Sequence, residues 1–121
     1  MARILIIDDS PTELFAFKRM LEEAGFQTAV ASTGEEGIEK ARREKPDLIL
    51  MDVVMPGMSG FQATRRLSKD PETATIPIIM VTTKDQETDR MWGLRQGARE
   101  YMVKPANAPE LVGKIQGLLA E

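Results

Sequence analysis

The chain has 121 residues, of which 42% are hydrophobic and 29% charged, a composition typical of a folded domain rather than of a disordered segment. It contains no cysteine and no histidine, which excludes disulfides, thiolate metal sites and phosphohistidine chemistry, and removes the usual general base. The net charge is −3 and no basic cluster is present, so binding to nucleic acid is not expected.

Short apolar runs alternate with segments of helical periodicity, beginning at the first residues. Residues 4–7 form a continuous apolar run, which is typical of a strand buried on both faces. A helix is predicted over about residues 11–24, because Ser10 is a good N-cap and Pro11 suits the first helical position. Glu13 follows Ser10 at the spacing of a capping box, in which its carboxylate would accept the Ser10 backbone N–H.

The rest of the chain continues this alternation. Four further strands are predicted at about residues 26–31, 47–51, 76–81 and 100–103. Four further helices are predicted at about residues 34–45, 61–69, 86–96 and 108–119. Strict alternation favours an α/β fold, doubly wound, with one parallel sheet covered by helices on both faces. A closed barrel of eight such units would need about twice the length, so residues 1–121 are interpreted as a single domain without an output domain.

No apolar run is long enough to cross a bilayer. The first three residues lead directly into the first strand, without the charged and apolar parts of a signal peptide. We therefore expect a cytoplasmic protein that makes no contact with the membrane.

Polar side chains stand where four of the predicted strands end. Asp8 and Asp9 follow the first strand, and Asp52 follows the third. Thr82 follows the fourth strand and Lys104 the fifth. The carboxyl ends of parallel strands meet at one edge of the sheet, where open α/β sheets bind their ligands. These side chains are therefore expected to share one shallow cleft.

Such a cleft suits phosphoryl transfer assisted by a divalent cation. Three carboxylates so close together cannot all stay ionised without a cation, and a set of oxygen ligands suits Mg2+ or Mn2+. Asp52 stands alone at the end of the central strand and is the candidate nucleophile, since aspartate can form an aspartyl phosphate. Lys104 and Thr82 would then hold the phosphoryl oxygens.

Response-regulator receiver domains have a signature that this chain resembles at four places: Asp8-Asp9-Ser10, Asp52 followed by Met55-Pro56-Gly57 and Gly60, Thr82, and Lys104-Pro105. The resemblance covers the whole chain. It implies a CheY-like, or flavodoxin-like, fold with the strand order 2-1-3-4-5. It also implies a two-component phosphoswitch whose phosphodonor is a histidine kinase or a phosphotransfer domain.

The same resemblance implies roles for individual residues. Asp9 and Asp52, with the backbone carbonyl of Val54, would ligate Mg2+, and Asp8 would act through a water molecule. Thr82 would turn inward on phosphorylation, and Tyr101 would move with it from an exposed to a buried position. The peptide bond between Lys104 and Pro105 would be cis, an isomer that only proline makes accessible at low cost.

A narrower resemblance concerns four surface stretches, residues 61–65, 69–73, 82–89 and 92–93, which are similar to the PilH-type regulators of bacterial twitching motility. Those regulators are stand-alone receivers served by a chemotaxis-like kinase that acts on type IV pili. The family resemblance implies an output protein at the face formed by the fourth helix, fifth strand and fifth helix. It is compatible with a monomer or with a weak homodimer through that face.

Two aromatic residues, Phe15 and Trp92, lie off the apolar stripes predicted for their helices. The stripe of the first helix consists of Phe17, Met20, Leu21 and Ala24, and that of the fourth helix consists of Glu87, Met91 and Leu94. A single exposed apolar residue is common on protein surfaces. The hypothesis that we set beside this ordinary explanation is that Phe15 contacts the phosphodonor and Trp92 the output partner.

Other functions are compatible with parts of the pattern. A phosphohydrolase working through an aspartyl phosphate would need an acid two residues after Asp52, where this chain has Val54. A flavin or nucleotide module would need a glycine-rich or hydroxyl-rich loop after the first strand, whereas Asp8 and Asp9 repel phosphate. A receiver that works without phosphorylation would not need the complete pocket. We therefore expect no enzyme beyond self-phosphorylation and dephosphorylation, and leave signal carrier and phosphate sink as two alternatives.

Overall fold

The computed structural model describes residues 1–121 and consists of alternating strands and helices. The strands are Arg3–Ile7 (β1), Gln27–Ala31 (β2), Leu48–Met51 (β3), Ile78–Thr82 (β4) and Glu100–Val103 (β5). The helices are Pro11–Glu23 (α1), Gly34–Glu44 (α2), Gly60–Lys69 (α3), Glu87–Gln96 (α4) and Ala108–Leu119 (α5). The predicted order of elements is confirmed, and each boundary lies within about two residues of its predicted position, the usual uncertainty of helix and strand ends.

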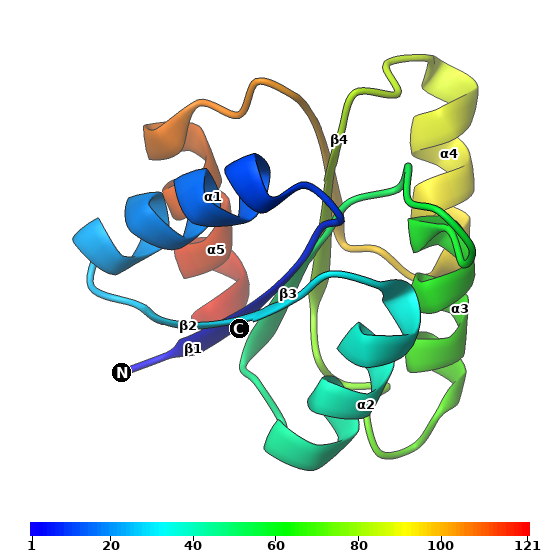
Figure 1. Ribbon diagram of the computed structural model, residues 1–121, viewed down its shortest axis with the longest axis horizontal. Helices are drawn as coiled ribbons and strands as arrows, with labels where there is room; N and C mark the ends of the chain where they lie inside the picture. Colours follow the sequence, from blue (N-terminus) through cyan, green and yellow to red (C-terminus); the bar gives the residue numbers. More distant parts are fainter.

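The five strands form one parallel sheet in the order β2-β1-β3-β4-β5, as expected. Helices α1 and α5 cover one face of the sheet, and α2, α3 and α4 cover the other (Figure 1). The strand order reverses between β1 and β3, where Ile7 pairs with Met51. The residues that follow this pair are Asp8 and Asp52, so the reversal places both carboxylates at the same edge of the sheet.

The central strands contribute side chains to both faces of the sheet, because successive residues of a strand point in opposite directions. Leu5 and Ile7 pack in the layer beneath α2, α3 and α4. Ile4 and Ile6 pack in the layer beneath α1 and α5. A strand buried on both faces must be apolar at every position, which explains the continuous apolar runs in the sequence.

The start of α1 differs from the predicted capping box. Ser10 caps the helix as expected, with its hydroxyl accepting the Glu13 backbone N–H at 3.3 Å. The Ser10 backbone N–H, however, donates to Oδ1 of Asp8 at 2.9 Å. The Glu13 carboxylate lies instead 3.0 Å from the ammonium of Lys104. The predicted capping box is wrong because Asp8 supplies a nearer acceptor and Lys104 attracts the Glu13 charge.

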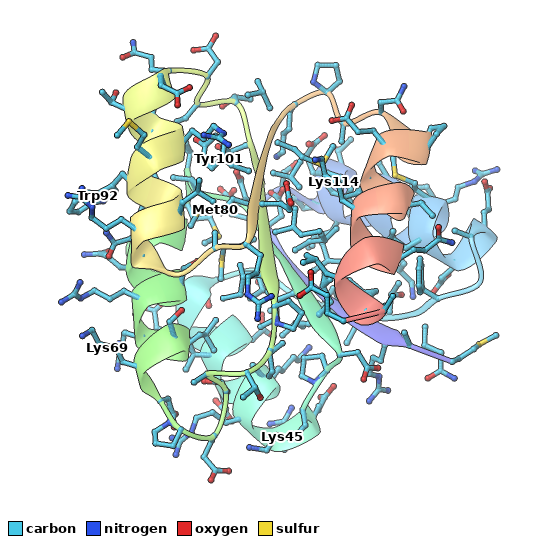
Figure 2. All side chains as sticks on the ribbon, turned by 180° about the vertical axis from the view of Figure 1, so that it is seen from behind. Lys45, Lys69, Met80, Trp92, Tyr101 and Lys114 are labelled. Atoms are coloured by element: carbon cyan, nitrogen blue, oxygen red, sulfur yellow. The ribbon has the colours of Figure 1, made fainter.

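The buried side of α4 also differs from the prediction. Phe15 and Trp92 are exposed as expected, at 65% and 49%, but Met91 of the predicted stripe is 55% exposed. The helix instead faces the sheet with Gly93, where a Cβ atom would lie 2.7 Å from Sδ of Met80. Figure 2 shows Met80 and Tyr101 between α4 and the sheet and Trp92 on the outer side of the helix. The close approach at the glycine sets the rotation of α4 and turns Met91 outward.

A second close approach, at Gly60, supports the loop that follows Asp52. A Cβ atom at Gly60 would collide with the backbone carbonyl oxygen of Asp52 and lie 2.7 Å from Cα of Val53. Backbone atoms cannot rotate away, so Gly60→Ala should lower the free energy of unfolding by about 3 kcal/mol. In α5, a Cβ atom at Gly113 would point into open space. The matched Gly113→Ala should therefore raise the free energy of unfolding, by about 0.5 to 1 kcal/mol.

Urea unfolding of both variants measures these changes. Wild-type stability in the Gly60→Ala variant would contradict the close packing of α3 on the end of β3.

Candidate functional site

The predicted site residues meet at the carboxyl edge of the sheet. Asp8 follows β1 and Asp52 follows β3, and each has a carboxylate oxygen within 4.8 Å of one from Asp9. Thr82 is the last residue of β4 and pairs with Val103, the residue before Lys104. The parallel register therefore brings side chains from four strand ends into one cleft.

The three carboxylates differ in their surroundings. Asp8 and Asp52 are buried, whereas Asp9 is exposed. Oδ1 of Asp52 accepts the backbone N–H of Val53 at 2.8 Å. Each buried carboxylate thus accepts a backbone N–H, whereas the exposed Asp9 carboxylate is not held in this way.

This donor set fits a small hard cation. All the donors are oxygen atoms, the type of ligand that Mg2+ and Mn2+ prefer. Mg2+ lies about 2 Å from its ligands, so two ligands of one ion lie at most about 4 Å apart. One carboxylate oxygen from each of Asp8, Asp9 and Asp52 lies within 4.8 Å of the other two, close to that range. The predicted residues Asp8, Asp9 and Asp52 are therefore assembled in a way that suits the metal.

Burial raises the pKa of the Asp52 carboxyl above its ordinary value, and the neighbouring Asp8 carboxylate raises it further. The Lys104 charge, the Val53 amide and the Thr82 hydroxyl act in the opposite direction without cancelling the rise. The pocket thus disfavours the ionised form of Asp52. A cation bound among the carboxylates would favour the ionised form of Asp52, which is the nucleophilic form.

Lys104 neutralises part of this negative charge. Its ammonium lies 2.9 Å from Oδ2 of Asp8, 3.0 Å from Oε1 of Glu13 and 3.6 Å from Oδ2 of Asp52. It also lies 6.0 Å from the centre of the Phe17 ring. Burial alone would lower the pKa of Lys104, but hydrogen bonds to Asp8 and Glu13 and the charge of Asp52 raise it above its ordinary value. The lysine is therefore held as a cation.

Glu13 is the residue of this cluster that the sequence analysis did not place in the pocket. The signal was its position in the first turn of the helix that follows Asp8 and Asp9, since that turn begins at the same edge of the sheet. The spacing to Ser10 indicated a cap instead. A carboxylate in that turn is compatible with either role, and the positions of Asp8 and Lys104 decide between them.

Thr82 and Tyr101 connect the pocket to the loop before α4. The buried Thr82 hydroxyl accepts the backbone N–H of Lys84 at 3.4 Å, and the half-buried Tyr101 hydroxyl donates to the Lys84 carbonyl at 2.9 Å. Burial raises the pKa of Tyr101 to about 12, with further contributions from the charges of Asp89, Asp52 and Asp85. Both residues thus hold the same short stretch of chain through its backbone.

The remaining predicted residues have distinct surroundings. Val54 follows the buried Val53 and exposes its side chain, and the role of its carbonyl stays a prediction. The peptide bond between Lys104 and Pro105 is cis, as the family resemblance implied. Phe15 and Trp92 lie exposed on α1 and α4 and are not among the residues that contact the buried carboxylates.

None of the helices combines the length and apolar character that spanning a membrane requires.

Residues 4–116 match the response regulator receiver domain. The chain is 58% identical over 120 residues to the protein PilH of Pseudomonas aeruginosa, and the alignment covers 99% of both chains.

Solved structures agree with this match. The chemotaxis response regulator CheY4 of Vibrio cholerae is 31% identical with a TM-score of 0.91, over 98% of this chain and 98% of that one. The receiver domain of the sensor histidine kinase PA1611 of Pseudomonas aeruginosa is 28% identical with a TM-score of 0.92, over 99% of this chain and 98% of that one. Its crystal structure has a magnesium ion coordinated in the active-site cleft. The chain therefore belongs to the family of response regulator receiver domains, the signalling modules of two-component systems.

Proposed function

We propose that this receiver domain accepts a phosphoryl group on Asp52 from a histidine kinase or a phosphotransfer domain. The observation that carries the proposal is the position of Asp52, buried beside Asp8 with its Oδ2 atom 3.6 Å from the Lys104 ammonium. In the transfer, a carboxylate oxygen of Asp52 would bond to phosphorus while the bond from phosphorus to the donor breaks. Because Oδ1 accepts the Val53 N–H, Oδ2 is the oxygen available for this attack.

Divalent Mg2+, or Mn2+, is the proposed cofactor. Asp9 and Asp52 with the backbone carbonyl of Val54 would hold the ion, and Asp8 would contact it through water. When bound, the ion offsets the charge of the carboxylates and of the phosphoryl oxygens. The all-oxygen donor set of the cleft supports this assignment, as does the magnesium site of the PA1611 receiver.

Lys104 and Thr82 are the proposed partners of the phosphoryl oxygens. The Lys104 ammonium, already near Asp52, would pair with one of them. The Thr82 hydroxyl would turn inward and donate to another, giving up its weak 3.4 Å contact with Lys84. Tyr101 bonds to the same stretch of chain and would move with it. The unphosphorylated and phosphorylated forms would then differ in surface, and a partner that binds only one of them would transmit the signal.

The cellular role that we propose is control of type IV pilus twitching motility through a chemotaxis-like kinase. The 58% identity to PilH over nearly its full length supports this role. The domain would work as a stand-alone cytoplasmic regulator, as its likeness to PilH suggests, and would act on no substrate other than its own phosphoryl group. The pocket chemistry is the same for a signal carrier and for a phosphate sink that drains its kinase.

The acceptor chemistry is tested by the mass of the intact protein after incubation with acetyl phosphate. Wild-type protein with Mg2+ should gain one phosphoryl group, because Asp52 is the nucleophile and the cation supports its ionised form. Asp52→Asn, or chelation of the metal, should abolish the gain. Phosphorylation that persists in Asp52→Asn would refute the assignment, and so would failure of wild type to bind beryllofluoride as well as to react.

The position of Tyr101 is tested by titration, which is unambiguous because the chain has 1 tyrosine. Absorbance of the phenolate should report a midpoint near pH 12 in the folded protein, mainly because of burial. In urea the midpoint should fall to about 10. Since the folded pKa is the higher one, the stability contributed by Tyr101 is complete below pH about 10 and is lost as the pH rises toward the folded value.

Circular dichroism across the titration separates phenolate formation from unfolding. A midpoint near 10 in protein that is still folded would contradict the half-buried position.

The two exposed aromatic residues test the proposed partner surfaces. Phe15→Ala should slow phosphotransfer from the cognate kinase and leave phosphorylation by acetyl phosphate unchanged, because it removes apolar area only from the donor contact. Trp92→Ala should weaken binding of the output partner and leave phosphotransfer unchanged. Each variant is the control for the other. Unchanged phosphotransfer in the first, or unchanged partner binding in the second, would remove the corresponding surface from the proposal.

A further inference from the structure

We propose that Glu13 is a positioning residue that competes with the phosphoryl group for Lys104, an inference that rests on the proposed function of Asp52 as the phosphoacceptor. In the unphosphorylated protein the Lys104 ammonium lies closer to Glu13, at 3.0 Å, than to Asp52, at 3.6 Å. Glu13 therefore draws the lysine toward α1 and away from the atom to which phosphorus would bond.

The three carboxylates around Lys104 differ in how easily they can lose it. The side chain of Asp8 is 2% exposed and that of Asp52 is 8% exposed, whereas the side chain of Glu13 is 38% exposed. A buried carboxylate that loses its cation is left unpaired at high cost, but an exposed one is taken up by water. If a phosphoryl oxygen replaces Glu13 as a partner of Lys104, no buried carboxylate is left without a cation.

The fold leaves Glu13 available for this role. The Ser10 backbone N–H donates to Asp8, whereas in a capping box it would donate to the Glu13 carboxylate. The Ser10 hydroxyl still caps the helix through the backbone of Glu13, a contact that does not need the glutamate side chain. The glutamate carboxylate can therefore bind or release Lys104 without changing the start of α1.

Two opposite effects follow for the ligands of the pocket. The negative charge of Glu13 offsets part of the positive charge of Lys104. This offset favours binding of a cation in the pocket and disfavours binding of an anion. Its removal should therefore weaken binding of Mg2+ and strengthen binding of the phosphoryl analogue beryllofluoride. For a partly exposed ion pair, each change should be about two- to fivefold.

The test is to measure Mg2+ affinity, and beryllofluoride affinity at saturating Mg2+, by titration calorimetry in wild type and in Glu13→Gln. Glutamine keeps the size of the side chain and removes its charge. Glu13→Asp keeps the charge but is too short to hold Lys104, so it should strengthen beryllofluoride binding as well. Wild-type beryllofluoride affinity in Glu13→Asp would overturn the competition, because charge alone would then explain the effect of glutamine.

The matched control is Glu110→Gln. Glu110 lies in the first turn of α5, as Glu13 lies in the first turn of α1, and it follows Pro109. Its backbone N–H donates to the side chain of the N-cap residue Asn107 at 2.9 Å. It carries the same charge without a contact to Lys104, so both affinities should stay at the wild-type values.

The outcomes separate this inference from the proposed function. Opposite shifts of the two affinities in Glu13→Gln support a positioning role, because a merely structural defect would weaken both ligands together. Shifts in the same direction, or no shift in a wild type that binds beryllofluoride, overturn the role of Glu13 and leave the phosphoacceptor intact. A wild type that neither binds beryllofluoride nor is phosphorylated on Asp52 overturns both.

Discussion

The structure depends on one electrostatic constraint, the burial of two carboxylates beside a single lysine. Asp8 and Asp52 are held out of water at the end of neighbouring strands, and Lys104 reaches both from the end of β5. Two buried carboxylates beside one ammonium give the pocket more acidic than basic groups. In the proposed function, the same imbalance would favour a metal ion in the cleft and would make the arrival of a phosphoryl group on Asp52 a large electrostatic change.

That change can reach α4 through a short series of contacts. Thr82 stands in the pocket at the end of β4 and bonds to Lys84, whose carbonyl accepts the Tyr101 hydroxyl. The Tyr101 ring in turn packs on Gly93, where a Cβ atom would lie 3.0 Å from the ring. Helix α4 therefore packs on Tyr101, the residue whose hydroxyl donates to the carbonyl of Lys84 in this loop. Packing this close transmits small displacements because it cannot absorb them.

The sequence was sufficient to predict the fold and the pocket because both follow from strand ends. Asp8, Asp52 and Lys104 each come directly after an apolar run, and parallel strands must bring such residues to one edge. The partner of Glu13 and the rotation of α4 were not predictable in this way. The first depends on which of two acceptors lies nearer to the Ser10 N–H, and the second on a glycine whose missing side chain leaves no periodic signal. Both are decided by tertiary contacts rather than by spacing along the chain.

The rotation of α4 also links the packing of the helix to its outer surface. Gly93 faces the sheet, so Met91 turns outward and joins Trp92 among the large exposed apolar residues. A helix that buried Met91 would stand further from Tyr101 and would be less sensitive to its position. The contact that would couple α4 to the pocket and the apolar surface proposed for a partner therefore have the same cause, the absence of a side chain at Gly93.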